Sequence, residues 1–238
     1  MRVDGRKPSD LRQVRIIPGF VKQAPGSVLI EMGETKVMCT ATVEDSVPQF
    51  LRNTGKGWVT AEYGMLPGCS KPRIPRESTR GRVGGRTHEI QRLIGRSLRG
   101  VTDMTTFGER TIWVDCDVIQ ADGGTRTASV TGSYVALALA LRQLRRTGVV
   151  TREALTGSVA AVSVGLVAGA ALLDLCYLED CSAEVDMNFV MTGEGQYVEV
   201  QGTAESKPFT NADLQKMADL AAQGIAELTR IQNNVLAA

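Results

Sequence analysis

Short apolar runs of strand-forming residues dominate the first half of the chain. Two of these runs are separated only by Gly33-Glu34, a pair that predicts a tight hairpin turn. A different spacing, with apolar residues on one helical face, follows them and predicts two long helices. The predicted strands cover residues 28–32, 35–43, 58–65 and 111–119, and the predicted helices cover residues 86–101 and 128–146.

The second half repeats this order of strands followed by a helix, although no sequence repeat relates the two halves. Strands clustered ahead of helices favour an α+β sandwich over a strictly alternating parallel sheet. With 238 residues and 43% hydrophobic content, the chain can bury a substantial core, as one large domain or as two fused halves. The predicted strands cover residues 158–166, 171–177, 184–191 and 197–201, and the closing helix covers residues 211–232.

A glycine pair stands between the last strand of the first half and the helix that follows it. The segment 122–127 has the sequence Asp-Gly-Gly-Thr-Arg-Thr, in which the glycines permit a sharp turn and close approach to a ligand. Gly124, the hydroxyl of Thr125 and the planar fork of Arg126 would surround an oxyanion at the positive end of the helix. An ordinary capped turn is the alternative, but Arg126 opposes the helix dipole unless an anion lies beside it. The segment therefore predicts a phosphate-binding loop.

A second arginine occupies an equivalent position. Arg86 follows Gly84-Gly85 and falls on the inward side of the first turn of the other long helix. One oxyanion bound between Arg86 and Arg126 would explain both arginines. The alternative is that each of them pairs with a nearby carboxylate, such as Glu89 or Asp122.

Charge is strongly segregated along the chain, although the formal net charge is only +1. Residues 73–99 contain eight arginines and two acids, which gives a local charge of about +6. Residues 174–186 contain five acids and no basic residue, which gives about −5. Part of the basic segment lies in the predicted loop 66–85, which is too long to be a mere connector. This distribution suggests an anionic substrate on one side and a metal ion or proton carrier on the other, with two solvated faces as the alternative.

Carboxylates interrupt the apolar strands of the acidic segment. Glu184, Asp186 and Asn188 share one face of a predicted strand, and Asp180 lies in the short connection that leads into it. Asp180 and Asp186 are therefore candidates to converge on Mg²⁺, which prefers one or two carboxylates plus phosphate oxygens. The alternative is that Asp180 caps a short helix and that Asp186 pairs with an arginine.

Several classes of site are excluded by composition. His88 is the only histidine, so no histidine-dependent triad, Cys/His cluster or paired-histidine metal site can be assembled. Five cysteines at scattered spacings indicate buried thiols of a reducing compartment rather than disulfides or a zinc site. The chain begins with charged residues and its longest apolar run contains glycines, so we expect neither a signal peptide nor a membrane span. These features predict a cytoplasmic protein.

Eight strings of residues, spread over essentially the whole chain, form a specific pattern. They are RVDGR (2–6), GWVTAEY (57–63), GRTHEIQRLIGRSLR (85–99), DCDV (115–118), QADGGTRT (120–127), ED (179–180), VDMN (185–188) and VEVQGTAE (198–205). This pattern resembles the ribonuclease PH family of phosphorolytic exoribonucleases; one departure is Ser206, where the family has glycine. The resemblance implies an α+β, ribonuclease PH-like fold, also described as ribosomal protein S5 domain 2-like. It further implies two similar βα halves within a single domain over residues 1–238.

The resemblance also implies a reaction. Inorganic phosphate attacks the last phosphodiester of an RNA 3′ end and releases a nucleoside diphosphate, so that no side-chain nucleophile is needed. The reverse reaction adds nucleotides from nucleoside diphosphates. Either Asp180 or a water held by the metal would protonate the leaving 3′ oxygen. By this resemblance the phosphate-binding residues are Arg86, Gly124, Thr125 and Arg126, and the catalytic and Mg²⁺-binding residues are Asp180 and Asp186.

The implied partners are RNA and further copies of the chain. The family forms a homohexameric ring, a trimer of dimers, that trims the 3′ ends of tRNA precursors and of other structured RNAs such as rRNA. Arg73 and Arg76 of the long loop would touch RNA phosphates and make binding salt-sensitive. Two other functions remain as alternatives: a non-catalytic RNA-binding ring subunit of an exosome-like assembly, and a small-molecule kinase. The first predicts that the site residues are lost, whereas here they are all present.

Overall fold

Two β-sheets form the framework of the computed structural model, which describes residues 2–238 apart from the side chain of Arg80. The first sheet has the strand order β1-β2-β3-β5-β4 and is antiparallel except for the pair β4 and β5. The second sheet has the order β7-β6-β8-β9 and is antiparallel throughout. The strands are β1 (Val14–Pro18), β2 (Gly26–Met32), β3 (Thr35–Glu44), β4 (Trp58–Met65), β5 (Thr111–Gln120), β6 (Val159–Val167), β7 (Ala170–Leu173), β8 (Val185–Thr192) and β9 (Tyr197–Ala204).

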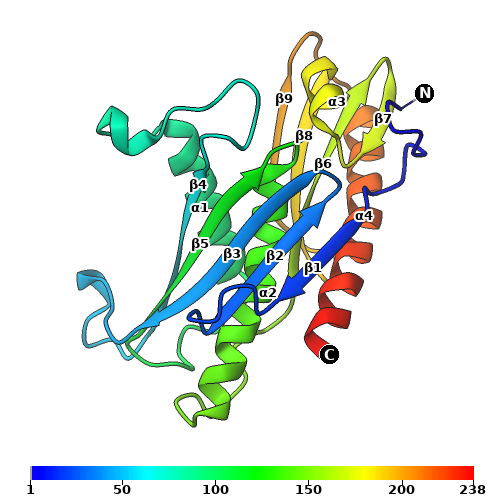
Figure 1. Cartoon of the computed structure of the whole chain (residues 1–238). Helices are drawn as coiled ribbons and strands as arrows, with labels where there is room; N and C mark the ends of the chain where they lie inside the picture. The colour runs from blue at the N-terminus through cyan, green and yellow to red at the C-terminus, as the bar shows by residue number, and fades with distance from the viewer. Residues whose placement is uncertain (1) are drawn as a thin grey trace.

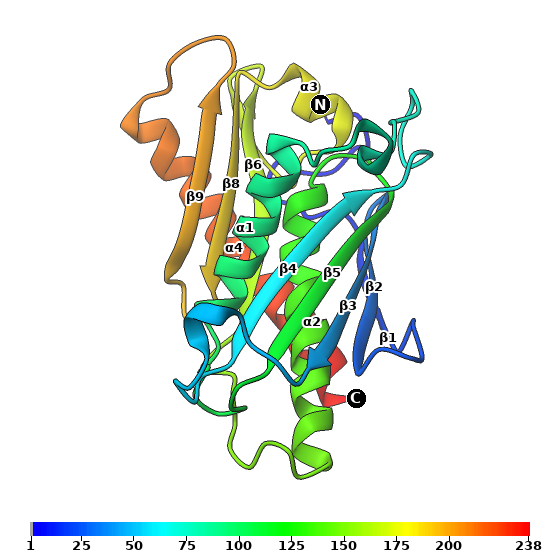
Figure 2. The same cartoon turned by 90° about the vertical axis from the view of Figure 1, so that its left-hand side faces the viewer.

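Two long helices stand between the sheets (Figure 2). In Figure 1 the first sheet faces the viewer, and α2 (Thr125–Arg146) runs behind it. Helix α2 packs against β2 and β3 on one side and against β6 on the other, while α1 (Gly85–Arg99) packs on β4. The closing helix α4 (Asn211–Ala237) packs against β6 and β7 and reaches β1. The remaining helices are short: α3 (Tyr177–Ser182) and the 3₁₀ turns η1 (Gln49–Leu51) and η2 (Glu77–Arg80).

The α+β class is confirmed, and the predicted elements match with one clear exception. The strand predicted over 171–177 is wrong in its second part, because Asp174 adopts a φ of 54°, which ends the extended backbone of β7. From Tyr177 the chain forms α3, so Asp180 lies in this helix rather than in a connection. Strand β1 and helix α3 were not predicted; α3 has only six residues, too few to show a helical period.

Close packing of α2 on the first sheet gives a test of this arrangement. A Cβ atom at Gly26 of β2 would overlap the carbonyl oxygen of Ala136 and lie 2.8 Å from the backbone nitrogen of Ala140. We expect Gly26→Ala to lower the free energy of unfolding by about 3 kcal/mol in urea denaturation, because helix backbone cannot move aside as a side chain can. Gly157→Ala is the control, since no heavy atom lies within 4 Å of its Cβ position. Equal stability of the two variants would contradict the packing described.

Candidate active site

A cleft of about 670 Å³ opens where the loop after β4, the start of α1, the β5–α2 connection, α3 and the first part of β8 meet. These elements lie together at the upper end of the molecule in Figure 2. Folding therefore brings the basic and the acidic segments of the sequence to one place. Arg76 is exposed on the same loop but does not line the cleft. The other predicted site residues all line it: Arg73, Arg86, Gly124, Thr125, Arg126, Asp180 and Asp186.

The glycine pair shapes the backbone of the predicted phosphate-binding loop. Gly123 and Gly124 both have positive φ values, 73° and 64°, which glycine adopts without steric cost. Helix α2 begins directly afterwards, at Thr125. In the part of the chain that the structure describes, the backbone N–H groups of residues 123–126 donate no hydrogen bond. Unpaired N–H groups at the positive end of a helix are suited to bind an anion.

The side-chain hydroxyl of Thr125, predicted to bind the anion, already has a partner within the protein. Its Oγ1 atom lies 2.9 Å from the hydroxyl of Tyr63, and both side chains are buried. Burial raises the pKa of Tyr63, while the hydrogen bond to Thr125 acts in the opposite direction. When Tyr63 donates this bond, the Thr125 hydroxyl keeps its own hydrogen for an anion, and the backbone N–H of Thr125 is available in either case.

Arg126 is held in place by side chains of two other elements. Its Nη1 atom donates to Oε1 of Gln201 at 2.7 Å and lies 3.4 Å from Oε2 of Glu89. Gln201 in turn donates to Glu89 at 2.8 Å and to Glu199 at 2.9 Å. The alternative of pairing with a nearby carboxylate thus holds in part for Arg126. Sequence reasoning gave no role to Gln201, because its contact with Arg126 joins residues that lie 75 positions apart in the chain.

Arg86 differs from Arg126 in its surroundings. It is exposed in the first turn of α1 and lines the cleft, and it forms no ion pair with any residue that the structure describes. An exposed cation at the positive end of a helix has little to stabilise it until an anion binds nearby. The predicted two-arginine arrangement therefore has one arginine preset by protein contacts and one without a fixed partner.

Asp180 and Asp186 both line the cleft, and their negative charges repel each other. Burial, followed by the charge of Asp180, raises the pKa of Asp186 to about 6. Burial also raises the pKa of Asp180, and the charges of Arg86 and Arg126 oppose this shift. The Oδ1 atom of Asp186 is buried without a hydrogen-bond partner among the described residues. Two repelling carboxylates, one with an orphaned buried oxygen, fit a divalent cation.

The cation would need ligands beyond these two carboxylates. Within residues 2–238 no group of three or more His, Cys, Asp or Glu side chains is placed to hold a metal ion. Glu184 does not join the pair, since its carboxylate accepts the N–H of Gly169 at 2.9 Å instead. Asn188, predicted on the same face as Asp186, does line the cleft. This donor set suits Mg²⁺, which takes its remaining ligands from water and substrate phosphates.

Two buried arginines near the N-terminus support the cleft from behind, and sequence reasoning gave them no role. Arg2 donates to both carboxylate oxygens of Glu179 at 2.8 Å, directly before Asp180 in α3. Burial would raise the pKa of Glu179, but its hydrogen bonds to Arg2 hold that pKa below its ordinary value. Arg12 donates to both oxygens of Asp174, at 3.0 and 2.7 Å. These pairs connect the N-terminal segment to the chain on either side of the turn into α3.

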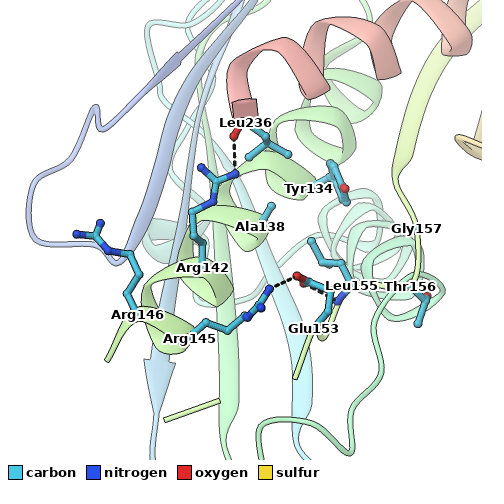
Figure 3. A pocket seen from close by; sticks show the side chains of 10 residues that line it. All are labelled: Tyr134, Ala138, Arg142, Arg145, Arg146, Glu153, Leu155, Thr156, Gly157 and Leu236. Atoms are coloured by element: carbon cyan, nitrogen blue, oxygen red, sulfur yellow. Dashed lines mark hydrogen bonds and ion pairs between the residues drawn. The ribbon is translucent and has the colours of Figure 1, made fainter. Parts of the chain in front are cut away.

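A second cavity, of about 630 Å³, lies at the other end of α2 and contains none of the predicted site residues. Arg142 donates to the carbonyl oxygen of Leu236, and Arg145 pairs with Glu153 (Figure 3). Arg146 extends away from these contacts. Arginines in the last turns of a helix also complement its dipole, which gives this cluster a structural role.

Comparison with known proteins gives close relatives over the whole chain. The sequence matches the 3′ exoribonuclease family in two parts, domain 1 over residues 10–143 and domain 2 over residues 157–224. It is 58% identical to the ribonuclease PH of Solibacter usitatus, with 99% of each chain covered. It is 60% identical to that of Moorella thermoacetica, covering 99% of this chain and 94% of the relative. The single domain over residues 1–238 stays a prediction.

Solved structures with the same fold are more distant in sequence. Rice Rrp46 superimposes with a TM-score of 0.80 at 16% identity, covering 99% of this chain and 100% of that one. The Archaeoglobus fulgidus exosome with RNA bound to the active site gives a TM-score of 0.79 at 19% identity, covering 96% and 91%. At these identities the likeness establishes the fold.

The buried pair Arg2–Glu179 can be tested by stability. We expect Arg2→Met to lower the free energy of unfolding at neutral pH by about 3 kcal/mol, because the buried Glu179 would lose its two shortest hydrogen bonds and keep only the more distant Arg6 and one backbone N–H. Arg145→Met removes one member of an exposed pair, with side chains 46% and 56% exposed, and should cost less than about 1 kcal/mol. Urea unfolding of both variants measures the difference, and a loss for Arg2→Met no larger than the control's would contradict it.

None of the helices in residues 2–238 combines the length and apolar composition that crossing a bilayer requires.

The two domain matches fall on the two halves that build the cleft, and the relatives cover nearly all of the sequence. The chain therefore belongs to the 3′ exoribonuclease family, and within it to ribonuclease PH.

Proposed function

We propose that this chain is a phosphate-dependent tRNA nucleotidyltransferase, which trims the 3′ ends of tRNA precursors and other structured RNAs by phosphorolysis. Inorganic phosphate is the co-substrate, and nucleoside diphosphates are the products; the reverse reaction extends RNA from nucleoside diphosphates. Identity of 58–60% to ribonuclease PH over almost the full length supports this function. The main structural support for this function is that unpaired backbone N–H groups, two arginines and two carboxylates all line one cleft.

We assign phosphate to the loop at the start of α2. The N–H groups of Gly124 and Thr125 and the guanidinium groups of Arg86 and Arg126 would bind its oxygens. A bound phosphate also supplies the negative charge that the first turns of α1 and α2 lack. In this position one phosphate oxygen is free to attack the RNA.

The reaction is a transfer between two oxygens. An oxygen of inorganic phosphate forms a bond to the phosphorus of the terminal nucleotide, and the bond from that phosphorus to the 3′ oxygen of the preceding nucleotide breaks. The departing 3′ oxygen takes up a proton, which either Asp180 or a water at the cation site would supply. Asp180 and Asp186 would hold Mg²⁺, which when bound neutralises charge on the phosphoryl oxygens. Catalysis then rests on positioning and charge, and no side-chain nucleophile takes part.

RNA contacts, assembly and location complete the proposal. Arg73 at the cleft and Arg76 farther along the loop would bind RNA phosphates. We expect a homohexamer built as a trimer of dimers, in line with the multisubunit exosome among the structures of the same fold. All five cysteines are free thiols, which supports a reducing compartment such as the cytoplasm.

The proposed reaction is tested with labelled RNA, Mg²⁺ and phosphate. The protein should shorten RNA from its 3′ end and release nucleoside diphosphates only when phosphate is present. Arg126→Ala should lower kcat/KM for phosphate by about 100-fold or more while RNA binding persists. Arg230→Ala, at an exposed position on α4, is the control and should behave as the wild type. Release of monophosphates without phosphate would identify a hydrolase, and release of no mononucleotide would favour a ring subunit or a kinase.

The loop arginines are tested separately by RNA binding at several salt concentrations. Arg73→Ala or Arg76→Ala should weaken tRNA binding and reduce the slope of log affinity against log salt by about one, since each would remove one phosphate contact. Arg15→Ala removes an arginine whose side chain is 63% exposed on β1 and should leave affinity and slope unchanged. An unchanged slope in both loop variants would remove these residues from the RNA interface.

A further inference from the structure

The carbonyl groups of the phosphate-binding loop are held from the side opposite the cleft. Thr35, at the start of β3, donates its hydroxyl to the carbonyl oxygen of Gly123 at 2.6 Å and accepts the N–H of Asp122 at 2.9 Å. Arg12 donates Nη1 to the carbonyl oxygen of Asp122 at 2.5 Å. Both side chains are buried, with 0% and 5% exposure, and neither lines the cleft.

These bonds determine where the N–H groups of the loop point. In a trans peptide unit the C=O and the N–H point in opposite directions. When the carbonyls of Asp122 and Gly123 are turned toward Arg12 and Thr35, the N–H groups of Gly123 and Gly124 are turned away from them. Gly123 and Gly124 line the cleft, and these N–H groups have no other partner among the described residues.

Arg12 is itself fixed, so it can act as a rigid support. It forms the paired hydrogen bonds to Asp174, whose carboxylate also accepts the backbone N–H of Arg12 at 2.8 Å. Burial alone would lower the pKa of Arg12, but the charge of Asp174 overrides it and raises that pKa. The guanidinium also lies where a side chain at Gly124 would project, with Nη2 2.9 Å from the Cβ position.

We propose that Arg12 and Thr35 are positioning residues for phosphate recognition: they orient the loop peptides toward the anion and set its affinity without touching it. This inference rests on the proposed function. Two adjacent glycines have many backbone conformations open to them, and most of these do not direct successive N–H groups to one point. Without the hydrogen bonds from Arg12 and Thr35, the loop would adopt its phosphate-binding conformation for only a fraction of the time. The apparent affinity for phosphate would fall in proportion to that fraction.

Thr35→Val tests the inference, because it removes the hydroxyl at nearly constant volume. We expect RNA-free protein with Mg²⁺ to bind inorganic phosphate about 10-fold more weakly in calorimetric titration, and KM for phosphate to rise while kcat is largely kept. Thr35→Ser retains the hydroxyl and should restore the wild-type affinity. Thr111→Val is the matched control, since this buried strand threonine likewise donates to a loop carbonyl, that of Ser46, at 2.6 Å.

Each outcome decides between roles. A purely structural role predicts that Thr35→Val and Thr111→Val lose stability alike and bind phosphate as the wild type does, which would overturn the inference. If Thr35→Val does not fold, Arg12→Lys takes its place, because lysine keeps the charge beside Asp174 but cannot also reach the Asp122 carbonyl in the same way. Normal phosphate binding by that variant would equally overturn the inference. A wild type that binds no phosphate would remove the proposed function, and this inference with it.

Discussion

The ion pair between Arg12 and Asp174 joins three segments that are far apart in the sequence. It connects the entry to the first sheet, the loop before α2 and the turn that leads into α3. Asp174 is fully buried, and its charge is compensated mainly by Arg12, with a backbone N–H and the more distant Arg6 adding to it. Arg12 thus joins two segments with positive φ values: Asp174 itself, and the loop that contains the glycine pair Gly123-Gly124. This ion pair therefore positions both the phosphate-binding loop and the turn into α3, two segments at the cleft.

Opposite charges are shared across the cleft rather than paired one to one. Arg126 is bound to Gln201 and Glu89, and Arg86 has no fixed partner, while Asp180 and Asp186 repel each other. A phosphate near the arginines and a divalent cation near the aspartates would each relieve one of these imbalances. The protein therefore presents charges that its substrates, and not its own residues, complete.

Much of this site could be predicted from sequence because its chemistry is local. The glycine pair, Arg126 and Arg86 lie at helix starts, where a cation is unfavourable by itself. The supporting residues could not be found in that way. Nothing in the sequence around Gln201 or Arg12 marks them, and the contacts that support the site join Gln201 to a residue 75 positions away and Arg12 to residues 110 or more positions away. Helix α3 was missed for a different reason, since a single short helix after a buried aspartate has no periodicity to detect.

The two halves of the chain divide the chemistry between them. Both arginines and the phosphate-binding loop belong to the first half, and both aspartates belong to the second, with the segment after α2 as their covalent connection. Either half expressed alone would keep an incomplete set of charges. Substitutions in the first half can therefore change how the incoming nucleophile is bound, and substitutions in the second half can change how the departing end is handled, as long as the contacts between the halves are kept.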